Sequence, residues 1–131
     1  MIVVDVNVIA YLLIPGRYTA SAEALLESDP VWAVPRLWRS ELRNILATYV
    51  RTQKMALQDA LALFQRASEI IDTEEYEVDT ASVLRLSEAS RCSAYDCEYV
   101  ALADFLDVDF VTADKKLANA FPRRARLLLE V

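Results

Sequence analysis

Short apolar runs alternate along the chain with longer segments in which apolar residues recur at helical spacing. The first run, Ile2-Val3-Val4, is continuous and β-branched, which is typical of a strand buried on both faces of a parallel sheet, and it stops at Asp5. Asp5 is therefore expected at the C-terminal end of a buried strand. Further strands are predicted at residues 31–34, 70–71, 110–112 and 126–131.

The segments between these strands have the periodicity of amphipathic helices. Asn7 is expected to cap a helix that ends before Pro15-Gly16, and Pro35 to open a long helix that reaches residue 52. Other helices are predicted at residues 21–27, 58–68, 79–89, 93–106 and from residue 115 onward. In the helix at residues 58–68, the residues expected to face inward are Leu61, Leu63, Phe64 and Ala67.

Strands that alternate with helices predict βαβ units, and hence a central parallel sheet of four to five strands with helices on both faces. A length of 131 residues and an apolar share of 55% suit one α/β domain over residues 1–131. In such open sheets, ligands bind beyond the carboxyl ends of the strands, near the switch point of the strand order. Asp5 and Asp114 both lie just past predicted strand ends.

The composition narrows the location and the chemistry of the protein. The apolar runs are too short to span a bilayer, and the N-terminus lacks the features of a signal peptide, so we expect a cytoplasmic protein without a membrane segment. Cys92 and Cys97 are not a CxxC pair, so neither structural zinc nor a disulfide framework is indicated.

The chain contains no histidine, which excludes Ser-His-Asp triads, Cys-His dyads and histidine-ligated metal sites. Hydrolytic chemistry would have to come from carboxylates, other oxygen or amine groups, or a hard cation held by oxygen ligands. The net charge of −6 argues against a broad nonspecific nucleic-acid-binding face and is compatible with acids that hold a divalent metal.

Four acidic residues form the candidate site. Asp5, Asp96 and Asp114 stand at junctions between elements, and Glu41 lies in the second turn of a predicted helix. Taken singly, each has an ordinary explanation as a helix cap or a solvated helix carboxylate. Taken together, they are expected to converge at one edge of the sheet, where like charges at close range usually require a cation.

The motifs around these acids resemble the PIN-domain family, in the right order and over almost the whole chain. They are Val4-Asp5-Val6-Asn7, Ser40-Glu41-Leu42, Tyr95-Asp96 leading into residues 99–103, and Val111-Thr112-Ala113-Asp114-Lys115-Lys116-Leu117. The resemblance is greatest to VapC-type toxins of prokaryotic toxin–antitoxin pairs. It implies a Rossmann-like α/β/α fold, Mg²⁺ or Mn²⁺ at the acids, endonucleolytic cleavage of RNA, a homodimer and a cognate antitoxin. Val6 and the Lys115-Lys116 pair depart from the family pattern and put a second metal ion in doubt.

In this interpretation Asp5, Asp96 and Asp114 ligate the metal directly or through water, and Glu41 ligates it or orients the nucleophilic water. Asn7 and Thr112 support the carboxylates or the substrate phosphate, although Asn7 would serve equally as a plain helix cap. Glu98 is left out, because its two-residue spacing from Asp96 points it to another helix face.

The RNA would be held by local positive charge. The candidates, each of which is otherwise an ordinary solvated side chain, are Arg36, Arg39, Arg43, Lys115 and Lys116. Tyr95 and Tyr99 are candidates for stacking on bases, whereas core packing is favoured for Trp38. Surplus apolar residues available for a dimer contact include Leu57, Leu61 and Phe64.

Two other classes of function stay open. In one, an aspartate after the first strand is phosphorylated with the help of Mg²⁺, but Asp5-Val6-Asn7 lacks a second acid at the next alternating position. In the other, a degenerate PIN-like module binds RNA or a protein without cutting. The presence of all four acids argues against this second class, and metal binding would separate it from a nuclease.

Overall fold

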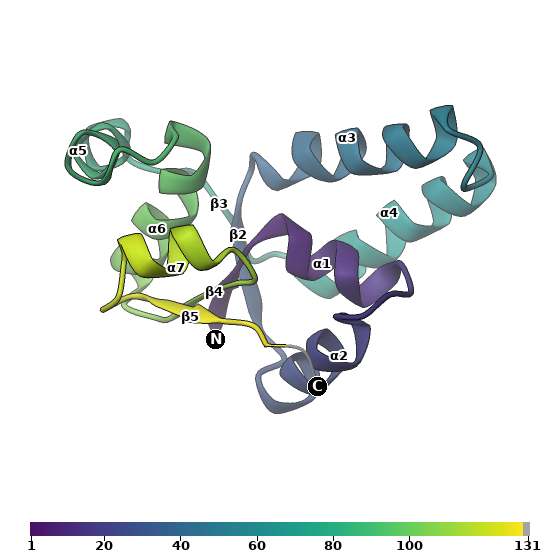
Figure 1. Ribbon diagram of the computed structural model, residues 1–131, viewed down its shortest axis with the longest axis horizontal. Coiled ribbons are helices and arrows are strands. Elements are labelled where there is room, and N and C mark those ends of the chain that lie inside the picture. The colour runs from purple at the N-terminus through teal and green to yellow at the C-terminus, as the bar shows by residue number, and fades with distance from the viewer. Residues whose placement is uncertain (130–131) are drawn as a thin grey trace.

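The computed structural model describes residues 1–129 and has a five-stranded sheet at its centre (Figure 1). The strands are β1 (Ile2–Val4), β2 (Trp32–Pro35), β3 (Glu75–Tyr76), β4 (Phe110–Thr112) and β5 (Ala125–Leu127). Their spatial order is β3-β2-β1-β4-β5, and all four pairings are parallel. The chain builds outward from β1 to β3 and then returns to add β4 on the other side of β1, so the switch point lies between β1 and β4.

Within residues 1–129 seven helices flank the sheet, which confirms the predicted α/β class. They are α1 (Val6–Leu13), α2 (Thr19–Ser28), α3 (Trp38–Arg51), α4 (Leu57–Ile71), α5 (Thr80–Ser90), α6 (Ala94–Leu106) and α7 (Lys115–Ala120). Helices α1 to α4 lie on one side of the strands in Figure 1, and α5 to α7 lie on the other. In residues 1–129 no helix has both the length and the apolar character needed to cross a membrane.

The core consists of the central strands and the helix faces packed on them. Val3, Val4, Trp32 and Phe110 are fully or almost fully buried because helices cover both faces of the sheet, which explains why β1 has no polar alternation. The ring of Phe110 stacks on Tyr99 of α6, with ring centroids 5.9 Å apart. Because these strands are buried on both faces, their position is fixed, and so is the position of the residues that follow their carboxyl ends.

Three predicted elements differ from the structure at their ends. Pro35 is the last residue of β2 instead of opening a helix, and α3 begins at Trp38. Residues 70–71 extend α4 instead of forming a strand, because Ile71, only 2% exposed, completes the apolar face of that helix. The chain then turns at Asp72, whose φ is 55°, and the strand follows at Glu75. Of the predicted strand at residues 126–131, residues 126 and 127 belong to β5, residues 128 and 129 are not part of a strand, and residues 130 and 131 lie outside the described residues.

The inward face of α4 agrees with the prediction at Leu63, Phe64 and Ala67, which lie in or against the core, and differs at Leu61. Ala60, Ala67 and Ile71 are buried, and Phe64 is partly buried against Trp38, with ring centroids 5.5 Å apart. Leu61, predicted to face inward, is 64% exposed. The short side chains of the two alanines let α4 lie close to its neighbours, so the buried stripe runs through them. The prediction that Trp38 packs in the core is confirmed.

Leu42 and Leu61 form a matched pair for testing this burial. Leu42 is 1% exposed and Leu61 is 64% exposed, and both lie inside helices. We expect Leu42→Ala to lower the free energy of unfolding by about 2–5 kcal/mol through lost burial and a cavity. Leu61→Ala should change it by no more than about 0.5 kcal/mol. Urea denaturation followed by circular dichroism measures both, and equal losses would contradict the assigned faces.

Candidate active site

The carboxyl ends of β1 and β4 bring two of the four acids to the switch point. Asp5 directly follows β1, and Asp114 follows β4 by two residues, while the two strands pair through Val3–Phe110 and Val4–Val111. Both aspartates cap the next helix: Asp5 Oδ1 accepts from the Asn7 N–H at 3.3 Å, and Asp114 Oδ1 accepts from the Leu117 N–H at 3.1 Å. The prediction that Asn7 caps α1 is therefore wrong, because Asp5 is the cap and Asn7 lies in the first turn.

Thr112 links these two strand ends. Its hydroxyl donates to Asp5 Oδ2 at 2.9 Å and accepts from the Asp114 N–H at 3.1 Å. Thr112 is fully buried and Asp5 is 9% exposed. Burial raises the pKa of Asp5, the bonds from Thr112 and Asn7 oppose that rise, and the charges of Asp96 and Asp114 add to it. The predicted contact between Thr112 and a carboxylate of the candidate site is present.

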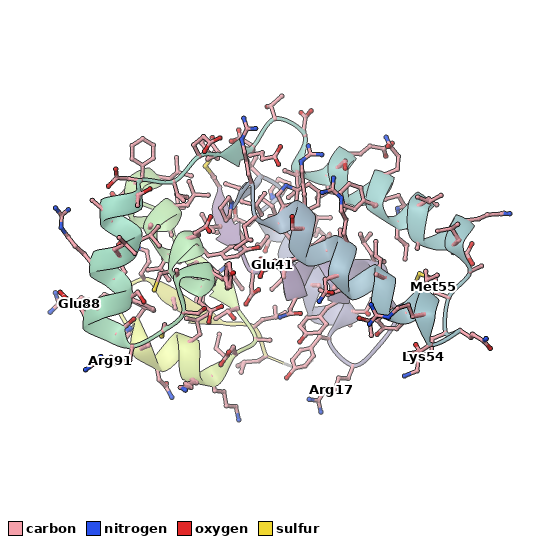
Figure 2. The ribbon with its side chains drawn as sticks, turned by 90° about the horizontal axis from the view of Figure 1, so that it is seen from above. Arg17, Glu41, Lys54, Met55, Glu88 and Arg91 are labelled. Atoms are coloured by element: carbon pink, nitrogen blue, oxygen red, sulfur yellow. The ribbon has the colours of Figure 1, made fainter. Side chains whose placement is uncertain are left out.

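Glu41 reaches the site from α3. It lies in the first turn of that helix, one turn earlier than predicted, because α3 begins at Trp38. Tyr99 Oη donates a hydrogen bond of 2.6 Å to Glu41 Oε1. Burial raises the pKa of Glu41, the bond from Tyr99 opposes the rise, and the charges of Asp5, Asp96 and Glu98 add to it. In Figure 2 Glu41 lies near the middle of the molecule, between α3 and the helices of the opposite side.

Tyr99 is held inside the protein and does not stack on a base. It is 2% exposed, and burial together with the neighbouring Glu41 carboxylate raises the pKa of its phenol far above the usual range. Its hydroxyl therefore stays protonated and serves as a fixed donor to Glu41. The prediction of base stacking by Tyr99 is wrong, whereas Tyr95 is 63% exposed.

Asp96 lies in the first turn of α6, where Ser93 caps the helix and accepts from the Asp96 N–H at 3.1 Å. Partial burial raises the pKa of Asp96, a separate side-chain interaction of its carboxylate with Ser93 opposes the rise, and the charge of Asp114 adds to it. The charges of Asp5, Asp96 and Asp114 thus each act on at least one other acid, and two of them act on Glu41, so that the four form a single coupled group.

Sequence reasoning missed two contributors to this group. Glu98 is half-buried and its charge acts on Glu41, although it was set aside for its spacing from Asp96. Glu41 lies on α3, so Glu98 can approach it although Glu98 points away from Asp96 on α6. Tyr99 follows Asp96 by three residues, which places both on one face of α6, and that spacing was a signal for its role.

The donor atoms of the group are of the type that a hard divalent cation prefers. In residues 1–129 no group of three or more acidic or cysteine side chains is placed so that it could hold a metal ion. The chemistry of the donors nevertheless matches Mg²⁺ or Mn²⁺, which prefer carboxylate and other oxygen ligands. The carboxylates also repel one another, and those of Asp5, Glu41 and Asp96 have raised pKa values. A bound cation would relieve that repulsion.

The cations proposed to hold RNA differ in their surroundings. Arg39 donates to both carboxylate oxygens of Glu75, at 2.6 and 3.0 Å, and Arg36 pairs with Glu77 at 3.0 Å. Arg36 precedes α3 instead of lying on it. Three further positions have no such carboxylate contact among the described residues: Arg43, whose guanidinium lies over the Phe64 ring at 5.3 Å, and the exposed Lys115 and Lys116. The RNA-binding role of these five residues stays a prediction.

Comparison with known proteins places this arrangement in a family. Residues 2–121 match the model of the PIN domain. A search of curated proteins finds no significant match.

The fold matches several solved structures at low sequence identity. The FitAcB structure from Neisseria gonorrhoeae has a TM-score of 0.75 at 19% identity and covers 95% of this chain and 96% of that chain. A toxin–antitoxin complex from Klebsiella pneumoniae has a TM-score of 0.70 at 16% identity, with full coverage of both chains. The sarcin-ricin loop cleaving toxin VapC20 of Mycobacterium tuberculosis has a TM-score of 0.64 at 17% identity and covers 92% of this chain and 95% of that chain. Since the family model spans most of the sequence and the fold agrees, the chain belongs to the PIN domain family.

Proposed function

We propose that this protein is a Mg²⁺- or Mn²⁺-dependent endoribonuclease that acts in the cytoplasm as the toxin of a type II toxin–antitoxin pair. The observation that carries the proposal is the coupled group of Asp5, Glu41, Asp96 and Asp114 near the switch point of the sheet. The chain contains no histidine that could provide the chemistry instead. Membership in the PIN family supports a nuclease. The similarity to an RNA-cleaving toxin and to toxin–antitoxin complexes supports RNA as substrate and an antitoxin as partner.

The four acids divide the work of the proposed reaction. Asp5, Asp96 and Asp114 would hold the cation, which when bound supplies an activated water and neutralises charge on the scissile phosphate. Glu41 would orient that water and accept its proton, a role that suits a carboxylate whose pKa is raised. Thr112 and Tyr99 act as positioning residues, because their hydroxyls fix the carboxylates of Asp5 and Glu41.

The proposed homodimer has a candidate surface on α3 and α4. Leu57 is 62% exposed and Leu61 is 64% exposed, and with Phe64 they line a groove that also contains Arg43 and Arg51. Exposed leucines this close together are typical of a protein contact surface. The structure contains one chain, so the dimer and the antitoxin rest on the family likeness and on this exposure.

Cleavage of a mixed pool of structured RNAs tests the proposed activity directly. We expect fragments with Mg²⁺ or Mn²⁺, none with chelator, and none from Asp5→Asn or Asp96→Asn, because each variant removes a carboxylate ligand. Gel electrophoresis with end-labelled RNA measures the products. Glu88→Gln, an exposed change on α5, is the control and should cleave like the wild type. Intact RNA under every condition, together with no metal binding by calorimetry, would favour the non-cutting module.

Thr112→Val tests the positioning role, since it keeps the shape of the side chain and removes the hydroxyl bonded to Asp5 and Asp114. We expect a loss of about 10- to 100-fold in cleavage rate or metal affinity. Thr48→Val, on the exposed surface of α3, is the matched control. Raising the Mn²⁺ concentration should restore part of the activity of Thr112→Val, and a variant as active as the wild type at limiting metal would contradict this role.

Burial of the acids and the repulsion between them provide a test that needs no RNA. The pKa of Asp96 is raised in the folded state. Its protonated form therefore stabilises the fold below the ordinary carboxyl pKa, and this stabilisation is lost as the pH rises through the raised pKa. At neutral pH in chelator, Asp96→Asn should therefore unfold at a higher temperature than the wild type, and the difference should shrink in acid. Asp59→Asn, in the exposed first turn of α4, is the matched control and should give no increase.

A bound metal ion should also change the unfolding temperature, because it offsets the repulsion between the carboxylates. Mg²⁺ or Mn²⁺ is expected to raise the unfolding temperature of the wild type by binding the folded state, and to raise that of Asp96→Asn less. Differential scanning fluorimetry measures both. A metal effect of equal size in the two proteins would exclude Asp96 from the metal site.

A further inference from the structure

A pocket beside the acidic group is not used by the proposed reaction. It lies where the turn between α1 and α2 meets α3, and it encloses about 330 Å³. Three of the six tyrosines of the chain line it, namely Tyr11, Tyr18 and Tyr49, together with Asn7 and Ile45. All three tyrosines are only half-buried, so their rings do not belong wholly to the core.

The pocket adjoins the acids through α1. Asn7, which lines the pocket, donates its backbone N–H to Asp5 Oδ1. The pKa of Tyr11 is raised mainly by burial and by Tyr18, and the charges of Asp5 and Asp114 also contribute, so the phenol lies within the field of the site. An RNA whose scissile phosphate lies at the acids would therefore have a neighbouring nucleotide at the mouth of this pocket.

The walls of the pocket are held in place before any ligand arrives. Tyr11 and Tyr18 stack with centroids 4.8 Å apart and an angle of 26° between the rings. Thr19 fixes the turn that carries them: its hydroxyl donates to the Tyr11 carbonyl at 2.6 Å and accepts from the Gly16 N–H at 3.0 Å. The Arg17 guanidinium lies over the Tyr18 ring at 5.1 Å, and in Figure 2 this arginine points outward at the edge of the molecule.

From this geometry we infer that the pocket binds the base of an unpaired nucleotide next to the scissile phosphate, with the tyrosines contacting the base and Asn7 available to its edge. Aromatic faces accept any base, and a side-chain amide is a donor and acceptor suited to base edges. A paired base inside a helix is covered by its neighbours, so only single-stranded or looped RNA can fill the pocket. This inference rests on the proposed ribonuclease function and adds the class of RNA and the residues that contact it.

Binding measured without cleavage tests the pocket separately from the nuclease. Fluorescence anisotropy with labelled single-stranded r(A)6, r(C)6 and r(U)6, and with a fully paired hairpin, would be recorded in Mg²⁺ on the Asp96→Asn background. At least one single strand should bind more tightly than the hairpin. Adding Tyr18→Ala should weaken that binding by about 5- to 100-fold, because base stacking on an aromatic ring is lost.

Matched variants separate stacking from folding. Tyr18→Phe keeps the ring and should bind within about twofold of the parent protein, since stacking needs no hydroxyl. Tyr49→Ala, on the α3 wall, should weaken binding as Tyr18→Ala does. Phe105→Ala removes an aromatic side chain that is 82% exposed and outside the pocket, and should change nothing. Thermal unfolding of each variant shows whether the fold is kept.

The outcomes distinguish the two proposals. Equal binding by Tyr18→Ala, Tyr49→Ala and the parent protein, equal binding of the hairpin and the single strands, or no binding of any single strand would overturn the pocket as a base site. Absence of metal-dependent fragments from the wild type would overturn the nuclease and leave the binding result standing. Selective loss of single-strand binding in the two tyrosine variants supports the pocket whether or not fragments are seen.

Discussion

Burial of β1 and β4 on both faces is the constraint on which the site depends. Each strand is only three residues long, and each is enclosed by helices, so neither can slide without exposing its whole apolar run. Their parallel pairing puts Asp5 and Asp114 at one edge, and Thr112 joins the two ends through its hydroxyl. The acids brought by α3 and α6 then complete the group, since α6 packs on both strands and its Tyr99 bonds Glu41 of α3.

Electrostatics and packing oppose each other at this edge. Burial in the core disfavours the charged forms of Asp5 and Glu41. Hydrogen bonds from the buried hydroxyls of Thr112 and Tyr99 partly stabilise those charged forms. Without a cation, the folded protein carries several unfavourable carboxylate interactions in a small volume. This is a common arrangement at catalytic sites, where the geometry needed for function is maintained against local stability by the surrounding core.

The sequence predicted the strands at residues 2–4 and 110–112 and the acids after them. A short uninterrupted apolar run in an α/β protein is stable as a strand buried on both faces of the parallel sheet. It did not predict that Pro35 ends β2 or that α4 turns Leu61 outward, since both depend on which neighbour fills the space. The bond from Tyr99 to Glu41 joins residues 58 positions apart, and no local pattern reports such a pair. The aromatic pocket was missed for the same reason, as its walls come from two helices, α1 and α3, and from the turn between α1 and α2.

The helix-capping bonds of Asp5 and Asp114 affect how homologous sequences should be interpreted. Each aspartate caps a helix that follows a strand end, so natural selection for a stable fold would retain it even in a lineage without the proposed nuclease activity. Glu41 and Asp96 do not cap their helices with their side chains, and genetic drift would remove them sooner. A homologue without the proposed nuclease activity would be recognised by changes at those two positions, and the persistence of the aspartates alone would say little about activity.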